Sequence, residues 1–218
     1  DGSLSILVHH FDGRIEWLGS PINALFDPRS TRQNRLVPQG LWSGHQEPIK
    51  KIVRNANGHV LVSRTDDNNA VIWRQRSRPS GPALVRQSLL SSSEHIHRTC
   101  VIGDGKILVN LHHDGISVWD IRTSPAEQLA RCTSSLSRKP LCVLEVPAPE
   151  QSDRVVYVAA IGADLTGTAW EINLAALKSK TSHGTETNGV VPLLRQFCTF
   201  SLNGMHEDVS YIFPVDPD

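Results

Sequence analysis

A serine, a histidine and an aspartate stand close together in the chain, as Ser63, His45 and Asp67. These three residue types form the nucleophile, the general base and the orienting acid of many hydrolases. A nucleophilic serine normally occupies an exposed turn beside oxyanion donors, whereas Ser63 ends the apolar run Val60-Leu61-Val62. The sequence also lacks the Gly-x-Ser-x-Gly elbow of the α/β-hydrolases. We therefore expect a structural role for these side chains and no catalytic residues.

Ten histidines and four cysteines are the other candidates for chemistry. The pairs His9-His10 and His112-His113 precede Asp turns, but neighbouring residues on a strand point to opposite faces and do not chelate together. His95 and His97 share a face if their segment is extended, yet the spacing offers no third ligand. The cysteines are scattered and form no Cys-x-x-Cys pair, which is typical of reduced thiols. We predict no metal site and no cofactor.

The segment Gly103-Asp104-Gly105-Lys106 superficially resembles a phosphate-binding loop. It lacks the spacing of the P-loop motif, and Ile107-Leu108-Val109 continues as a strand rather than a helix. We expect a tight hairpin turn here. Asp12-Gly13, Asn57-Gly58 and Asp114-Gly115 have the same explanation, because glycine readily adopts positive φ.

The elements that must position these residues are strands that recur along the chain. Four tryptophans, about 50 residues apart, each end a segment made of an apolar strand, a turn and a second strand. These tryptophans are Trp17, Trp73, Trp119 and Trp170. The strands are apolar almost throughout, as in sheets buried on both faces. The intervening stretches are expected loops: residues 20–40, 74–94, 123–140 and 175–191.

Composition agrees with an ordinary globular protein, with 39% hydrophobic and 20% charged residues. Lys plus Arg and Asp plus Glu both number 22, so the formal net charge is zero. A balanced charge gives no electrostatic case for nucleic acid or an anionic membrane as the partner. No apolar run approaches the ~18 residues of a membrane helix. We expect a cytoplasmic protein that binds other proteins, without nucleic-acid binding or direct membrane insertion.

One unit carries a family resemblance. It opens with Gly44-His45 and continues through Ser63 and Asp67 to Trp73. It resembles a WD40 repeat, which begins with Gly-His and closes with a strand that ends in Trp-Asp. The resemblance implies a structural tetrad of His45, Ser63, Asp67 and Trp73, in which a buried aspartate receives hydrogen bonds from its neighbours.

The third unit supplies the closing dipeptide as Trp119-Asp120. Asn110 replaces its serine, and His95 or His97 is the candidate for its histidine. The remaining repeat-closing residues are Trp17 and Trp170.

The resemblance implies an all-β, WD40-like β-propeller in a single partial domain over residues 1–218. We expect about three full blades and two partial ones. The repeat units are approximately 1–20, 41–74, 95–122, 141–174 and 198–218. A propeller usually needs 4–8 blades to protect its sheet edges, so we expect the chain to belong to something larger.

Two longer segments extend the resemblance. Residues 43–54 and 208–217 are similar to propeller sequences of the rabconnectin family, the large subunit of the fungal RAVE complex and its animal relatives. The similarity implies a non-enzymatic scaffold that helps to assemble the vacuolar proton ATPase. Its partners would be peripheral ATPase subunits at vacuolar or endosomal membranes. The alternatives are an adaptor or structural propeller of a coat, nuclear-pore or ubiquitin-ligase complex, and a propeller hydrolase.

A candidate partner-binding surface comprises Trp42, Arg74, Arg76 and Arg78. Trp42 lies outside the repeat pattern, and tryptophan often anchors an interface. The alternatives are that Trp42 packs between blades and that the arginines belong to a solvated loop.

Overall fold

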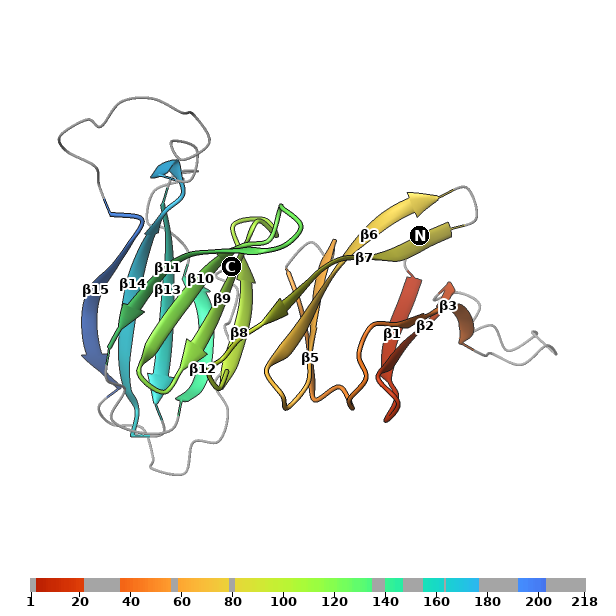
Figure 1. The fold of residues 1–218 in the computed structure, drawn as a ribbon, viewed down its shortest axis with the longest axis horizontal. Helices are drawn as coiled ribbons and strands as arrows, with labels where there is room; N and C mark the ends of the chain where they lie inside the picture. The colour runs from red at the N-terminus through yellow and green to blue at the C-terminus, as the bar shows by residue number, and fades with distance from the viewer. Residues whose placement is uncertain are drawn as a thin grey trace. The chain divides into compact units, whose positions relative to one another are not determined.

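The computed structural model describes residues 3–21, 36–55, 59–78, 81–134, 140–146, 155–162, 164–176 and 192–202. These residues form four antiparallel sheets, A to D (Figure 1). The chain divides into two compact units, Asp1–Ser91 and Ser92–Asp218. Each unit contains two of the sheets.

Unit 1 holds sheets A and B. Sheet A consists of β1 (Ser3–His9), β2 (Arg14–Pro21) and β3 (Val37–Ser43), in that order. Sheet B consists of β4 (Lys51–Arg54), β5 (Val60–Arg64), β6 (Asn69–Arg78) and β7 (Gly81–Ser91), also in chain order.

Unit 2 holds sheets C and D. Sheet C consists of β8 (Arg98–Ile102), β9 (Ile107–His112), β10 (Gly115–Asp120) and β11 (Glu127–Thr133). Sheet D consists of β12 (Pro140–Val146), β13 (Val155–Gly162), β14 (Thr166–Asn173) and β15 (Leu194–Ser201). Each strand pairs with its neighbour in the chain, so every sheet is a meander.

The predicted repeat is visible in the register of all four sheets. Each repeat tryptophan pairs with an apolar residue of the preceding strand: Trp17 with Leu7, Trp73 with Leu61, Trp119 with Leu108, and Trp170 with Val158. The pairing with the following strand shifts register next to the same tryptophan in each sheet. A shift of this kind is a β-bulge, which bends a strand and increases its twist. The four tryptophans therefore occupy equivalent register positions in the four sheets.

Two predicted loops are wrong. Residues 74–94 contain the end of β6 and all of β7, and residues 123–140 contain β11. Both β7 and β11 are outermost strands, and β11 is only partly buried along its length. Polar residues are tolerated on such a strand, so its sequence lacks the apolar run that marks the inner strands.

The end of the described chain also differs from expectation. Residues 198–201 belong to β15, the fourth strand of sheet D, rather than to the start of another sheet. The strand predicted within 206–214 lies outside the described residues.

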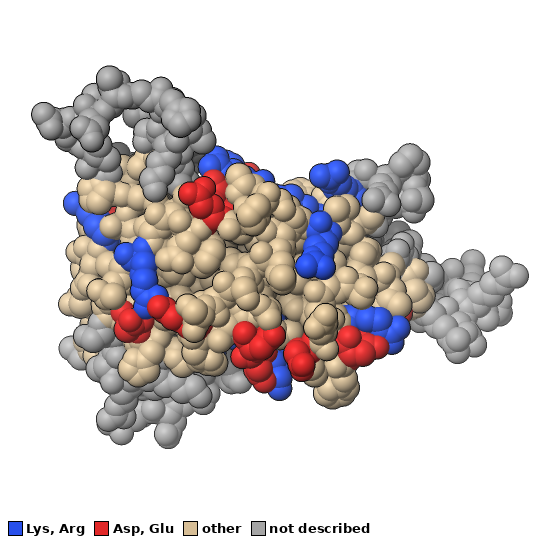
Figure 2. Space-filling model, viewed as in Figure 1, with Lys and Arg blue, Asp and Glu red and all other residues tan. Residues whose placement is uncertain are grey.

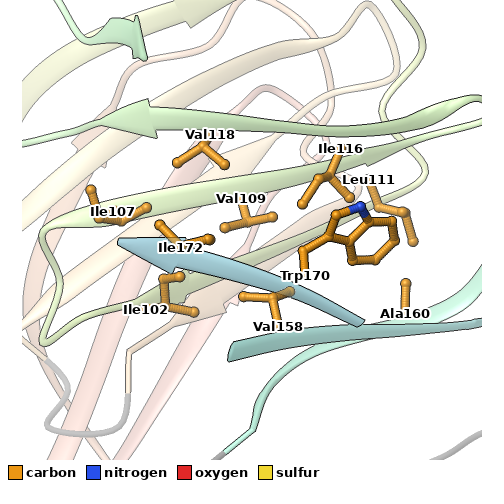
Figure 3. Packing of buried hydrophobic residues seen from close by; sticks show 10 residues of the cluster. All are labelled: Ile102, Ile107, Val109, Leu111, Ile116, Val118, Val158, Ala160, Trp170 and Ile172. Atoms are coloured by element: carbon orange, nitrogen blue, oxygen red, sulfur yellow. The ribbon is translucent and has the colours of Figure 1, made fainter. Parts of the chain in front are cut away.

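The core of unit 2 lies between sheets C and D (Figure 3). In that view the ring of Trp170 lies among Leu111, Ile116, Val158 and Ala160. A smaller core in unit 1 gathers Ile15 from sheet A with Leu61, Val71 and Trp73 from sheet B. Burying one such aliphatic side chain stabilises a protein by roughly 1.5–3 kcal/mol, so packing between sheets is the main source of stability in each unit.

The predicted hairpin turns are present. Gly13, Gly103, Gly105 and Gly115 all have positive φ. At Gly115 an added Cβ would lie 2.0 Å from the carbonyl oxygen of Cys132, so that turn requires glycine on steric grounds as well. The Asn57-Gly58 turn lies outside the described residues.

Candidate functional site

Gly44 lies close to the indole of Trp73, and His45 is linked to that indole through a serine hydroxyl. A Cβ at Gly44 would lie 2.6 Å from two ring carbons of Trp73, so only glycine leaves room for the ring. The indole Nε1–H of Trp73 donates to Oγ of Ser63 at 2.7 Å, and Nε2 of His45 lies 2.7 Å from the same oxygen. One hydroxyl therefore joins the histidine before β4 to the tryptophan of β6.

Asp67 is placed differently from the expectation of a buried aspartate. It lies exposed in the turn between β5 and β6, where its carboxylate accepts hydrogen bonds from the Thr65 hydroxyl and from the backbone N–H and side-chain amide of Asn69. These bonds hold the pKa of Asp67 below its usual value, because they favour the charged form. Asp67 thus orders its own turn.

Opposing effects act on the pKa of His45. Partial burial lowers the pKa of its imidazole, while the negative charge of Asp67 raises it. Burial prevails, and the net pKa of His45 is below 6.5. The ring is consequently neutral at pH 7, in the form that accepts or donates a single hydrogen bond at each nitrogen.

Ser63 is not arranged as a nucleophile. The residue is fully buried, and its Oγ already contacts both His45 and Trp73. A substrate carbonyl has no approach to an oxygen enclosed in this way. The geometry fits a structural hydrogen-bond chain.

Sheet C contains the same kind of histidine–serine–tryptophan hydrogen-bond chain, but its residues come from other positions of the sheet. By register, Asn110 takes the place of Ser63, but its side-chain oxygen accepts from the Thr99 hydroxyl at 2.9 Å. The indole of Trp119 donates instead to Ser117 at 2.9 Å, two residues earlier on the same strand. Nε2 of His112 lies 2.7 Å from that hydroxyl. The serine has moved from the second strand of the sheet to the third.

His112 therefore fills the role for which His95 and His97 were the candidates. Its Nδ1 lies 3.1 Å from the backbone carbonyl oxygen of His95. A carbonyl only accepts, so Nδ1 carries the proton and Nε2 of the neutral ring accepts from Ser117. The sequence signal for this arrangement was Ser117, a buried polar residue between the valine and isoleucine of an apolar strand.

The described residues of sheet D do not form this hydrogen-bond chain. Ala160 occupies the register position of Ser63 and offers no hydroxyl. Within the described residues, Nε1 of the fully buried Trp170 has no hydrogen-bond partner. This tryptophan contributes through packing alone (Figure 3).

Asp120, the second residue of the Trp-Asp dipeptide, forms an ion pair with Arg122. The buried carboxylate of Asp120 accepts from the backbone N–H of Arg122 at 2.8 Å and from the guanidinium at 2.6 Å. The pair raises the pKa of Arg122. The dipeptide therefore fixes the turn that follows β10.

The described residues of unit 1 enclose a cavity of about 480 Å³ beside His45. Its lining comes from the segment before β4, the β5–β6 turn and β7: Ser43, Gly44, His45, Gln46, Glu47, Thr65, Asp67, Asn69, Arg86 and Leu89. Leu89 is 47% exposed and adds an apolar side chain to this lining. Sequence reasoning missed Glu47, Arg86 and Leu89, because nothing in the spacing of these residues shows that they meet.

The described residues of the candidate partner-binding surface have different surroundings. Trp42 is half-buried, packs against the unit 1 core and lies 6.2 Å from Trp17 between ring centroids. Arg74 and Arg76 follow Trp73 on alternate positions of β6, so they face away from that core. Arg76 is exposed, whereas the guanidinium of Arg74 donates to Gln87. The side chain of Arg78 lies outside the described residues.

On the face drawn in Figure 2, described charges of both signs are interspersed. No group of three or more His, Cys, Asp or Glu side chains among the described residues is arranged to hold a metal ion. In the same part of the chain, no helix is long and apolar enough to cross a membrane.

No protein-family model matches the chain. Its structure is similar to the crystal structure of Saccharomyces cerevisiae Sqt1, with a TM-score of 0.56, 12% identity and coverage of 80% of this chain and 46% of that one. The fold is all-β and of the WD40-like β-propeller type. At this identity the likeness shows the fold alone.

A curated relative is similar in sequence. The chain is 24% identical over 184 residues to the Saccharomyces cerevisiae protein named regulator of V-ATPase in vacuolar membrane protein 1. The match covers 79% of this chain and 14% of that protein. The chain therefore corresponds to a small part of its much longer relative.

Proposed function

We propose that this chain is a non-enzymatic scaffold that binds protein partners and contributes to regulating the assembly of a vacuolar proton ATPase. The observation that carries the proposal is the similarity to the yeast V-ATPase regulator across 79% of the chain. Peripheral subunits of the ATPase, at vacuolar or endosomal membranes, are the partners that follow from it.

The site supports binding rather than catalysis. Ser63 and Ser117 are buried within structural hydrogen-bond chains, which leaves neither hydroxyl accessible to a substrate. The cavity beside His45 is instead open to partner side chains and has mixed character. Within the described residues, Arg86 and Glu47 at its wall form no side-chain hydrogen bond or ion pair, and exposed Leu89 adds an apolar surface.

Two contact regions follow for the proposed partner. The first is the cavity rim formed by Glu47, Arg86 and Leu89. The second is the arginine row of β6, comprising Arg74, Arg76 and Arg78, which occupy alternate positions of the strand. Trp42 packs against the unit 1 core one residue before the cavity-lining Ser43, so we infer that it supports the first region.

The test is a pull-down of purified peripheral ATPase subunits by the full-length protein that contains this chain. Arg86→Glu, Leu89→Ser and Arg76→Glu are compared with the unaltered protein. We expect each of these three substitutions to raise the dissociation constant for the subunits by about tenfold or more, which is the effect of losing one central interface residue. Lys106→Glu is the matched control, because it reverses an exposed charge in the β8–β9 turn of unit 2.

Three results would contradict the proposal. The first is binding that no rim or β6 substitution changes. The second is recovery of coat, nuclear-pore or ubiquitin-ligase subunits from cells in place of ATPase subunits. The third is a hydrolytic activity of the purified protein that Ser63→Ala abolishes.

A further inference from the structure

Four histidines gather at one end of sheet C, outside the cavity and the arginine row. The rings of His95 and His97 meet edge to face with centroids 4.7 Å apart. The ring of His97 lies 6.3 Å from that of His113, and neighbouring His112 is 97% buried, with 3% of its side chain exposed. No metal-binding group is present among the described residues, so the cluster needs a different explanation.

The segment 92–97 is tied to the end of sheet C. The chain passes from unit 1 to unit 2 at this segment. His97 N–H donates to the Leu111 carbonyl at 2.8 Å, and Nδ1–H of His112 donates to the His95 carbonyl at 3.1 Å. The carboxylate of Glu94 pairs with Arg131 of β11. Strands β9 and β11 of sheet C thus hold the segment, and His112 is the buried histidine of the cluster.

The hydrogen bonds around His112 require the neutral ring. The His95 carbonyl accepts the Nδ1 proton, and Nε2 accepts from Ser117, which in turn accepts from Trp119. If Nε2 also carried a proton, its N–H and the Ser117 hydroxyl would be two donors that face each other. The hydroxyl hydrogen would then have no acceptor among these hydrogen bonds. This second proton would also place a full charge in a buried site, and the charged ring is best solvated by leaving that site.

The surrounding charges compensate only in part for protonation of His112. Glu94 lies 3.6 Å from His112 Nδ1 but already pairs with Arg131, whose guanidinium also binds Asp114 at 2.7 Å. The two carboxylates favour the charged ring of His112, Arg131 opposes it, and burial outweighs the carboxylates, so the pKa of His112 is lowered. Around His97, the neighbouring histidines and Arg98 of β8 all oppose protonation.

We propose that His112 and the segment 92–97 form a proton-sensitive latch. Near neutral pH the latch holds the segment against the end of sheet C, and acidification below about pH 6.5 releases it as His112 and His97 gain protons. Burial lowers the pKa of His112, and burial together with the neighbouring histidines and Arg98 lowers the pKa of His97. Both groups therefore remain neutral at pH 7 and become charged as the pH falls.

Hydrogen–deuterium exchange of the full chain at pH 7.5 and pH 5.5 tests the latch. The reporters are a peptide covering 92–98 and a reference peptide within β9, with rates corrected for the intrinsic pH dependence of amide exchange. We expect the 92–98 peptide to exchange at least tenfold faster at pH 5.5, while the β9 peptide retains its protection.

Substitutions separate the latch from general acid unfolding. A glutamine can donate to the His95 carbonyl and accept from Ser117 without titrating, so His112→Gln and the double variant with His97→Gln should show no release. The control, His9→Gln, changes an exposed histidine of sheet A and should behave like the unaltered chain. The proposal is overturned if the 92–98 peptide exchanges equally at both pH values, if β9 loses protection with it, or if the double variant still releases the segment.

Discussion

A single serine hydroxyl joins a histidine to a tryptophan in two of the sheets, but from different strands. In sheet B the hydroxyl is that of Ser63, and in sheet C it is that of Ser117. Sheet D carries Ala160 in the register position of Ser63 and leaves the indole N–H of Trp170 without a partner among the described residues. At this scale the bond is useful for stability and dispensable for the fold, because packing holds each indole in place.

The first prediction concerns Ser63→Ala. The substitution leaves the Trp73 indole N–H and the His45 ring without their common partner in a buried site. We expect the free energy of unfolding to fall by about 1–3 kcal/mol, the usual cost of an unsatisfied buried polar group. Urea denaturation measures it.

Ser91→Ala is the control for Ser63→Ala. Ser91 is an exposed serine of the same sheet whose hydroxyl donates to the side chain of Asn69, a bond that water can replace. We expect a clearly smaller loss. Equal losses for the two substitutions would show that the Ser63 chain contributes nothing specific.

A second prediction concerns Gly44→Ala. The added methyl group would lie 2.6 Å from the Trp73 ring, so the ring or the segment before β4 must shift. Overpacking of this kind costs about 1–3 kcal/mol. Thermal unfolding followed by Trp fluorescence measures the loss. An unchanged melting temperature would contradict the explanation of the Gly-His dipeptide given above.

At the scale of elements, the inner strands were predictable and the outer strands were not. Strands such as β5, β9 and β13 are apolar because both faces are buried, and that property is readable in the sequence. The outermost strands β7 and β11 tolerate polar residues and looked like loops. The cavity shares this limitation, because Arg86 and Leu89 come from β7 and meet His45 only after the sheet has formed.

Register equivalence between sheets gives the third prediction. Ala160→Ser places a hydroxyl where Ser63 stands in sheet B, within reach of the Trp170 indole N–H. We expect slower hydrogen exchange of that indole proton by NMR and a gain in stability of up to about 1 kcal/mol. Ala159→Ser, on the neighbouring position of β13, points to the other face and is the control. An indole proton that exchanges equally fast in Ala160→Ser and the unaltered chain would refute the equivalence.

At the scale of the whole molecule, three histidines couple stability to pH. The pKa values of His45, His97 and His112 are all lowered from 6.5. The unfolded chain then binds more protons than the folded chain as the pH falls below 6.5, so acidification favours unfolding and the loss levels off below the folded pKa values.

The fourth prediction follows from that sign. We expect the urea midpoint to be lower at pH 5.5 than at pH 7.5, and the difference to shrink when His45, His97 and His112 are all replaced by glutamine. Replacement of His9, an exposed histidine of sheet A, by glutamine serves as the control for the substitution itself. A midpoint that rises on acidification would contradict the pKa directions.

We propose a binding scaffold, similar in sequence to a V-ATPase regulator, that holds its partner at the cavity rim. The most direct test is affinity purification of the full-length protein from its own cells, with and without Arg86→Glu, followed by quantitative mass spectrometry. We expect peripheral proton-ATPase subunits to co-purify and Arg86→Glu to deplete them by about tenfold, as for a central interface residue. Co-purification of unrelated complexes, or ATPase subunits recovered equally by both forms, would contradict it.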